Sequence, residues 1–371
     1  MHEVIRGAKI EDFKELPGSL WVLSTFFNPT QAVNKINNYR YFHQNLIRQG
    51  VKILTVECAF KDASFELDSN DADKLIQVRS DSILWHKERL LNIGLKYLPS
   101  ECDKIAWLDA DIIFLNNDWA KEVAKLLETY HFVKPFNRAI RLNKKETREI
   151  LLKNNIKNLN LHNRPKYKNS EYSANQENLI IYMSVFGLCA RRDIIQEIGF
   201  YDRFIVGNGD MVISGAILNE KPYWDILPTA LEKDIEVWSK KASNLTANKG
   251  IAFIPDDILH LFHGRIANRN YYDRIRILKK RKFDPNQDLR INQDDCFEWA
   301  SNKKRLQQQL FGYFKNRNED DHFFQGIKIF IRERLARSLI YLFRFIDRQI
   351  GLIGIKLRKN HPDIYYFLKR K

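Results

Sequence analysis

The sequence has few of the features that mark disulfide-stapled, fibrous or membrane-spanning proteins. Only four cysteines occur in 371 residues, and none stands in a Cys-x-x-Cys pair or at the spacing of a zinc module. We therefore expect buried or free thiols of a reducing compartment. No apolar run approaches the roughly 20 residues that cross a bilayer, and no signal peptide is visible. Glycine and proline number only 15 and 10, which excludes collagen-like chains. These absences predict a globular, cytoplasmic protein.

Acidic residues are scarce in one part of the chain. The last 46 residues contain twelve lysines or arginines and three acids, whereas the whole chain has 61 and 46. The body is therefore close to neutral, so we expect no nucleic-acid partner. Residues 327–346 have one aliphatic side and arginines elsewhere. This pattern predicts a helix that either packs on the body or makes peripheral contact with the inner, anionic face of a membrane.

Apolar runs of strand length alternate with amphipathic runs of helical length in the first third of the chain. This order is typical of an α/β fold, in which a mostly parallel central sheet is flanked by helices. Further on we expect a polar excursion over 137–177, and from 291 a basic, helical extension to 371 that follows a catalytic domain over 1–290. The predicted strands are 20–27, 51–56, 104–108, 179–186, 251–254 and 258–262, and the predicted helices are 32–49, 85–98, 119–130, 144–154, 192–198 and 211–218.

Two carboxylates, Asp109 and Asp111, follow the apolar strand 104–108 directly. Ligands bind beyond the carboxyl ends of strands in parallel sheets, and oxygen ligands there suit Mg²⁺ or Mn²⁺. Such an ion can hold a diphosphate and neutralise its charge as it leaves. The alternative interpretation is a polar loop start or a cap, since Asp-x-Asp is common in any sequence.

The segment Leu90-Leu-Asn-Ile-Gly-Leu-Lys-Tyr-Leu98, followed by Lys104-Ile-Ala-Trp-Leu-Asp-Ala-Asp-Ile112, resembles the central stretch of GT-A-fold glycosyltransferases. The closest types are galactosyltransferase-like and family-2-like enzymes of bacterial or viral origin, and the resemblance covers about residues 20–278. It implies a Rossmann-like core, a nucleotide-sugar donor and Mn²⁺ or Mg²⁺ as cofactor.

The same resemblance implies roles for single residues. Asp111 is expected to hold the metal, with Asp109 holding donor sugar or ribose and serving as a further metal candidate. A solvated helix face is the alternative for Lys87, and ordinary surface charge is the alternative for Glu57. The implied donor-binding positions are Ser24, Thr25, Phe26, Glu57, Lys87, Asn92, Asp109 and Asp111, and Arg79 in a polar loop is a further phosphate candidate.

A second acidic site follows in the segment 199–211, where Gly207 and Gly209 flank Asn208 and precede Asp210. Asp210 at the start of an apolar helix suits the helix dipole, so it is either a cap or a functional acid. The segment resembles the one in galactosyltransferase-like enzymes that supplies the base for the acceptor hydroxyl. We favour Asp210 as that base, which implies inversion of configuration. The family more commonly has a Glu-Asp pair here.

Two histidines, His260 and His263, lie in a strand-like run. Because neighbouring side chains of a strand alternate in direction, we expect at most one to reach a metal. The late histidine that GT-A enzymes often supply favours His263, with His260 as its packing neighbour. Downstream, Arg265 and Arg269 either close over the diphosphate or belong to a solvated basic helix.

The sequence thus predicts a metal-dependent hexosyltransferase. It would move a sugar from a UDP- or GDP-sugar to a hydroxyl of a glycan or lipid-linked acceptor. Two alternatives remain open. One is a nucleotidyltransferase acting on sugar phosphates, although the Ser24–Pro29 loop lacks the expected Gly-rich basic pattern. The other is a non-catalytic adaptor at a membrane surface.

Overall fold

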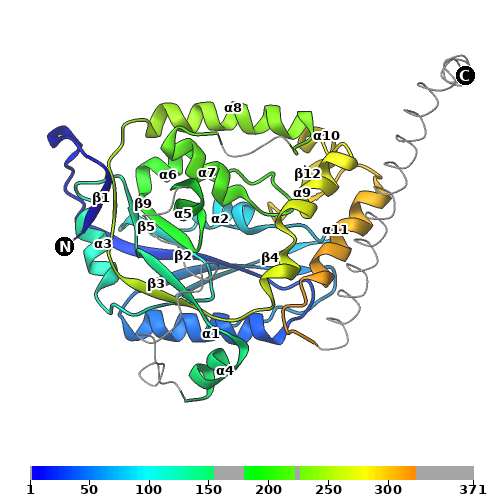
Figure 1. Ribbon diagram of the computed structural model, residues 1–371, viewed down its shortest axis with the longest axis horizontal. Coiled ribbons are helices and arrows are strands. Elements are labelled where there is room, and N and C mark those ends of the chain that lie inside the picture. The colour runs from blue at the N-terminus through cyan, green and yellow to red at the C-terminus, as the bar shows by residue number, and fades with distance from the viewer. Residues whose placement is uncertain (1, 154–178, 222–225, 323–371) are drawn as a thin grey trace, which may run out of the picture. The chain divides into compact units, whose positions relative to one another are not determined.

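The computed structural model describes residues 2–153, 179–221 and 226–322 (Figure 1). Residues Met1–Asp320 form one compact unit, and Asp321–Lys371 form a second of which only 321 and 322 are described. The predicted tail helix 327–346 lies outside the described residues, and so does the part 154–177 of the predicted polar excursion 137–177. The division into a catalytic part to residue 290 and an extension beyond it stays a prediction.

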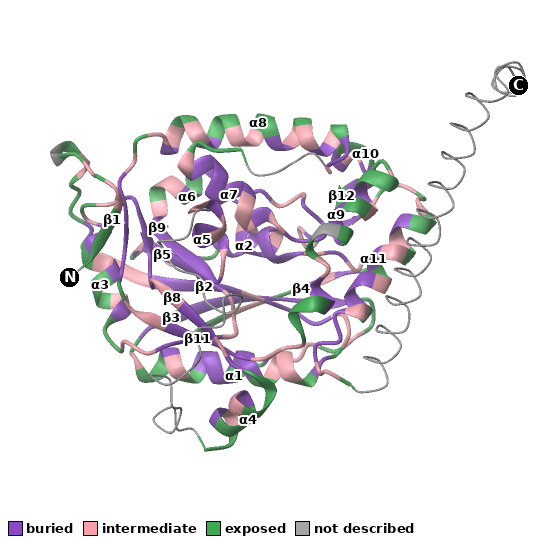
Figure 2. Cartoon of the chain, in the orientation of Figure 1, coloured by how far each residue is buried: buried purple, intermediate pink, exposed green. Residues whose placement is uncertain are grey.

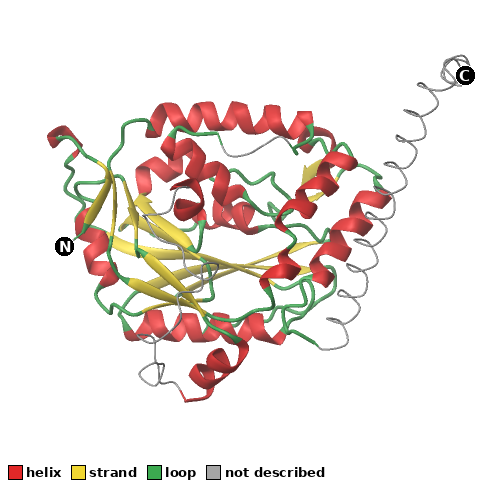
Figure 3. Cartoon of the chain, in the orientation of Figure 1, coloured by secondary structure: helices red, strands yellow, loops and turns green. Residues whose placement is uncertain are grey.

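An eight-stranded, mostly parallel sheet runs through the compact unit (Figure 3). Strands β4, β3, β2 and β5 are parallel neighbours, β9 runs antiparallel to β5, and β10 and β7 are parallel to each other. The predicted α/β class is therefore confirmed. In sheet order the strands are β1 (Glu3–Arg6), β10 (Ile251–Phe253), β7 (Phe132–Lys134), β9 (Gly187–Arg191), β5 (Cys102–Leu108), β2 (Ser19–Phe27), β3 (Lys52–Phe60) and β4 (Lys74–Ser80).

A second sheet of three strands contains β6 (Ile112–Phe114), which begins directly after Asp111. The central strand of this sheet, β11 (Asp257–His260), pairs antiparallel with β6 and parallel with β8 (Arg138–Arg141). A short antiparallel pair, β12 (Leu289–Ile291) with β13 (Phe297–Trp299), follows later in the chain.

Helices cover both faces of the main sheet (Figures 1 and 2). Alternation along β2 explains this, because Val22 packs in the cluster that contains the α1 and α3 side chains, whereas Leu23 packs with those of α2, α6, α7 and α8. The helices are α1 (Val33–Arg48), α2 (Lys87–Leu95), α3 (Trp119–Leu126), α4 (Lys144–Lys153), α5 (Leu179–Ser184), α6 (Arg192–Ile198), α7 (Gly209–Leu218), α8 (Thr229–Thr246), α9 (Tyr271–Lys280), α10 (Pro285–Asp288) and α11 (Lys304–Asn316), with 3₁₀ turns η1 (Ile10–Asp12) and η2 (Ile266–Arg269).

Helix α2 packs unusually close to the sheet, and this close packing places its first turn. A Cβ on Gly94 would lie only 2.5 Å from the Leu23 side chain and 3.1 Å from that of Val56. Glycine at this position therefore lets α2 lie directly on β2 and β3, which carries Lys87 to the carboxyl ends of the strands.

Three secondary-structure predictions were wrong. The expected strand 179–186 is instead helix α5, and the strand begins at Gly187 after a turn in which Phe186 and Gly187 have φ of 64° and 134°. A short apolar run carries no periodicity that separates a buried helix from a buried strand. Arg79 lies in β4 and not in a loop, and Glu57 lies within β3, which continues to Phe60. The elements that were not predicted include strands β1, β4, β6, β7, β8, β12 and β13 and helices α8, α10 and α11.

Within the described ranges, no helix has both the length and the apolar character to cross a membrane. All four cysteines fall in these ranges, and each is buried and free. The thiol prediction is therefore confirmed at the level of structure.

Candidate active site

The first part of the site is formed by backbone pairing between two short strands. Strand β6 begins directly after Asp111, and β11 pairs with it so that His260 lies opposite Ile112. The Leu261 amide donates to the Asp111 carbonyl at 2.8 Å. Residues almost 150 positions apart in the sequence are thus held side by side by main-chain hydrogen bonds.

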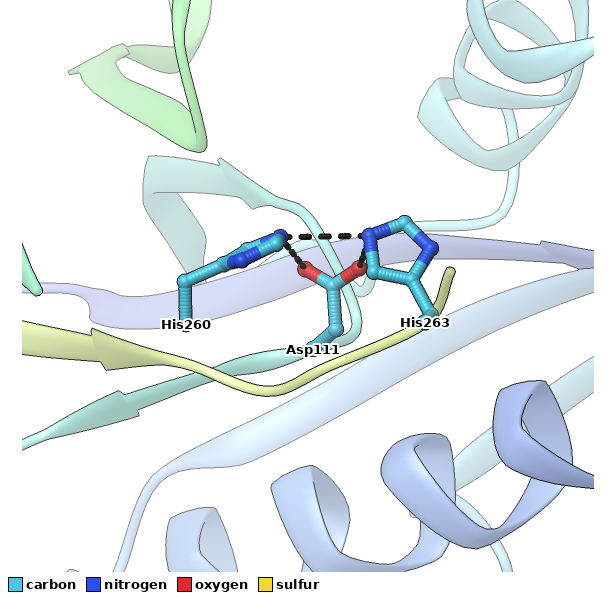
Figure 4. A group of neighbouring side chains, drawn as sticks. All are labelled: Asp111, His260 and His263. Carbon is cyan, nitrogen blue, oxygen red and sulfur yellow. Dashed lines mark hydrogen bonds and ion pairs between the residues drawn. The ribbon is translucent and has the colours of Figure 1, made fainter. Parts of the chain in front are cut away.

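The Asp111 carboxylate lies between the imidazoles of His260 and His263 (Figure 4). Its Oδ2 is 2.9 Å from Nε2 of His263, its Oδ1 is 3.6 Å from Nε2 of His260, and the two Nε2 atoms are 3.2 Å apart. Among the described residues, these three form the one group of at least three potential metal ligands.

The expectation that only one histidine could reach the site was wrong. Strand β11 ends at His260, so the alternation of side chains does not extend to His263, which reaches Asp111 from the following loop. Asp109, the further metal candidate, is absent from this group of described ligands and faces Lys87 instead.

The electrostatics of the trio fit a divalent cation. Burial alone would raise the pKa of Asp111, but the larger combined effect of His263 and His260 lowers it below its ordinary value. The Asp111 side chain is therefore an ionised carboxylate. Burial also holds the pKa of His260 well below its usual value, which keeps that imidazole neutral. Oδ1 of Asp111 is buried and accepts no hydrogen bond from the described residues. The set therefore consists of two imidazoles and one carboxylate, of which one oxygen has no hydrogen-bond donor in the described part of the chain. Such a set of ligands suits Mn²⁺ and related ions.

His263 is held from behind by a buried ion-pair network that the sequence did not predict. Arg269 donates to the His263 carbonyl at 2.8 Å, and Glu319 accepts from Arg269 at 3.4 Å and from Arg317 at 2.9 Å. The Glu319 carboxylate also lies 3.7 Å from Nδ1 of His263. Arg269 is 7% exposed, so it is neither the expected lid nor part of a solvated helix, and it supports the loop that carries His263.

The second part of the site is a charged group around Lys87 in the first turn of α2. Its Nζ lies 2.5 Å from the Asp109 carboxylate and 4.0 Å from that of Asp210. Burial alone would lower the pKa of Lys87, but Asp109 and Asp210 raise it above its usual value. Lys87 is 9% exposed, so it is not the solvated helix residue of the alternative interpretation.

Asp210 lies in the first turn of α7, where its Oδ1 accepts from the Met211 amide at 2.9 Å. Burial raises the pKa of this carboxyl, and Lys87 opposes the effect. Its side chain is nevertheless 31% exposed, so one carboxylate is both stabilised by the helix and open to an incoming group.

Glu88 is an acid that the sequence analysis missed. It is 3% exposed, and its side chain packs so closely on Gly209 that a Cβ there would lie 2.5 Å away. Burial raises its pKa to about 8, with Lys87 opposing and Asp210 adding to the effect. Glu88 could have been suspected from the sequence, because it is next to Lys87 in the helix that precedes the Asp-x-Asp strand.

Most of the remaining donor candidates lie along β2 and β3. Ser24 is buried and donates to the Leu108 carbonyl at 3.3 Å, and Phe26 packs edge-on against Tyr39. Thr25 lies between them on β2 and is only partly buried. The Glu57 carboxylate accepts from the Glu66 amide at 2.6 Å and from Gln77 at 2.9 Å, which ties it to the loop that follows β3.

Three further candidates lie apart from the charged group. The Asn92 amide is engaged by the backbone of Phe200 through two hydrogen bonds of 2.8 Å. Arg79 donates to the carbonyls of Lys61 and Ala63 at 2.5 and 2.7 Å. Arg265 is exposed at the start of η2. The donor-binding roles of these residues stay predictions.

No protein-family model and no curated protein matches this chain. Solved structures with some likeness to this chain include a galactosyltransferase. The catalytic domain of Drosophila β1,4-galactosyltransferase 7, complexed with xylobiose, is 15% identical over 54% of this chain, with a TM-score of 0.29. The match spans 61% of that domain's length.

Two bacterial structures cover more of the chain. Glucosyl-3-phosphoglycerate synthase from Mycobacterium tuberculosis is 11% identical over 71% of this chain and 80% of its own, with a TM-score of 0.35. S. aureus TarS (1–349) in complex with UDP-GlcNAc is 12% identical over 80% and 72%, with a TM-score of 0.36. Likeness at this level carries no argument about function, which has to come from the side chains of the site.

Proposed function

We propose that this chain is a metal-dependent glycosyltransferase. It would transfer a hexose from a UDP- or GDP-sugar to a hydroxyl of a glycan or lipid-linked acceptor. The observation that supports the proposal most directly is the placement of two chemically different groups after the same strand β5. Asp111 joins the two histidines, and Asp109 joins Lys87 and Asp210.

Asp111, His260 and His263 would hold Mn²⁺ or Mg²⁺. A bound divalent ion there would bind the donor's diphosphate and stabilise the charge that develops on it as the sugar leaves. The unsatisfied, buried Oδ1 of Asp111 supports this assignment, because a buried carboxylate oxygen without a donor is otherwise unfavourable.

Asp210 would accept the proton of the acceptor hydroxyl. A general base works best when its pKa approaches the working pH, and burial raises the pKa of Asp210 from its ordinary value. Lys87 would keep the carboxylate ionised before the acceptor arrives and would orient Asp109 toward the donor sugar. Direct displacement with a single base of this kind inverts the anomeric configuration.

Ser24, Thr25 and Phe26 on β2 and Glu57 on the adjoining β3 would contact the nucleoside, because β2 pairs with β5, the strand that precedes Asp109 and Asp111. A cytoplasmic location, with residues 327–346 touching a membrane, belongs to the same proposal and stays a prediction.

The test is a thermal-shift panel of nucleoside-diphosphate sugars with and without Mn²⁺. One donor class should raise the melting temperature in the presence of the ion, and a chelator should remove the effect. Formation of a glycosidic bond with that donor and an added glycan then establishes transfer. Stabilisation by no donor under either condition would contradict the proposal.

A further inference from the structure

Arg274 on α9 is a buried cation that no carboxylate contacts directly, although it is near enough to Asp210 to lower the pKa of that carboxyl. The side chain is 5% exposed, and no described carboxylate lies within 4.0 Å of its guanidinium. It donates to the Tyr313 hydroxyl at 3.0 Å and to the side-chain oxygen of Asn208. Both partners are neutral, and its Nε is buried with no acceptor among the described residues.

Other buried arginines of the compact unit are better satisfied. Arg269 and Arg317 share the carboxylate of Glu319, and Arg191 donates to the carbonyls of Leu127, Glu128 and Asp12. Burying a guanidinium without an anion or a full set of acceptors is unfavourable. The stacking of Arg274 on the Tyr271 ring, 4.8 Å from its centroid, offsets only part of that cost.

A second unsatisfied donor lies next to Arg274. The indole Nε1 of Trp85 is buried and has no partner among the described residues. Its ring lies 6.0 Å from the Arg274 guanidinium and 5.1 Å from that of Arg317. Gly207, at φ +87°, lies against both groups, and a Cβ there would lie 3.1 Å from the indole and 3.3 Å from Arg274 and so crowd them.

These donors adjoin the candidate base. Asn208, which binds Arg274, is the N-cap of α7 and stands two residues before Asp210. Tyr271, whose ring stacks on the Arg274 guanidinium, is 45% exposed, so a single ring contact links the guanidinium to a solvent-exposed side chain.

We propose that the Arg274 guanidinium, with the indole N–H of Trp85, forms a subsite for a phosphate or carboxylate group carried by a substrate. Guanidinium and indole N–H groups are donors only, so their natural ligand is an anionic oxygen. The group belongs either to the donor's diphosphate or to an acidic acceptor. The identity of that substrate rests on the proposed sugar transfer, whereas anion binding itself does not.

The experiment measures binding of inorganic pyrophosphate and inorganic phosphate to the full chain by calorimetry, with a chelator present. Arg274→Gln should raise the dissociation constant at least about tenfold, the loss expected for one charge-assisted contact. Arg276→Gln is the matched control, since Arg276 lies on the same helix, is 65% exposed and pairs with Asp273. The dissociation constants of Arg276→Gln for phosphate and pyrophosphate should equal those of the wild type.

Two further variants keep the test decisive if Arg274→Gln folds poorly. Trp85→Phe removes the indole N–H and keeps an aromatic ring, and Arg274→Lys keeps the charge but loses the fork; both should weaken binding by a smaller factor. Wild-type affinity in these variants, or no anion binding by the wild type, would overturn the proposal.

Binding of UDP shows whether the anionic group belongs to the sugar donor or to the acceptor. If the group is the donor's diphosphate, Arg274→Gln should also weaken UDP binding with Mn²⁺ by a similar factor. If it belongs to the acceptor, UDP affinity should stay constant while KM for an acidic acceptor rises. Asp111→Asn should retain metal-free phosphate binding, so a failure of the proposed transferase function would leave this result intact.

Discussion

The two halves of the candidate site differ in how their charges are balanced. In the Asp111 trio, one partly buried carboxylate faces two imidazoles, and its buried oxygen Oδ1 has no donor among the described residues. In the Lys87 group, one cation already lies between two carboxylates whose side chains are each 31% exposed. The first arrangement is incomplete without a cation. The second already contains a cation that compensates part of its negative charge, and its carboxylates are open to solvent, as expected for groups that exchange a proton or contact a sugar.

The largest expected effect comes from removing the acid of the trio. Asp111→Asn should abolish metal binding and reduce turnover by roughly 10³-fold or more, because charge stabilisation worth several kcal/mol is lost. Mn²⁺ binding by electron paramagnetic resonance and turnover would be measured together. Asp118→Asn, an exposed acid at the start of α3, serves as control. Unchanged turnover would remove Asp111 from the mechanism.

Asp210→Asn should separate the two halves. We expect transfer to fall by about 10²–10⁴-fold, the usual contribution of a positioned base, while metal and donor affinities stay constant. Asp193→Asn is a closely matched control, since Asp193 accepts from the Ile194 amide at 2.9 Å in the first turn of α6, as Asp210 does in α7. A collapse of donor affinity in Asp210→Asn would instead make the acid structural.

Lys87→Met should affect the folding of the second half. Without the cation, Asp109 and Asp210 lose their compensation, and we expect a loss of about 3 kcal/mol in the free energy of unfolding. Chemical denaturation measures it. Lys104→Met is the comparison, because Lys104 is also buried but bonds mainly to carbonyls away from the site. This variant should lose stability yet retain donor binding. Wild-type stability in Lys87→Met would show that the carboxylates do not need the cation.

The smallest effect is expected behind the trio. Glu319→Gln should weaken Mn²⁺ binding about 10- to 100-fold, as is usual when a partner of a metal-ligating histidine is altered. Glu298→Gln, which removes a buried carboxylate paired with Arg290, controls for general destabilisation. If both variants bind Mn²⁺ like the wild type, Glu319 only balances its arginines.

Much of the core could be predicted from the sequence, since most strands and helices between residues 19 and 126, β4 and β6 excepted, lie on apolar runs or on clear helical periodicity. Asp109, Asp111 and Asp210 stand out because each follows or begins a predicted element, whereas Lys87 was identified only through the family resemblance. What the sequence did not carry are contacts set by tertiary packing. His260 reaches Asp111 through the pairing of β11 with β6, and Glu319 reaches His263 from beyond α11. The helical start at 179 and strand β4 also depend on neighbours and not on local periodicity.

The residues that follow α11 contact two parts of the chain that are distant in sequence, the start of α1 and the loop of His263. The Asp320 carboxylate accepts from the Val33 and Asn34 amides at 3.0 and 2.8 Å, at the beginning of α1, while the adjoining Glu319 stands behind His263. Removal of the chain from Arg317 onward would therefore remove both the acceptor at the start of α1 and the carboxylate behind His263. Proteolytic cleavage at this point should thus abolish activity before the protein unfolds.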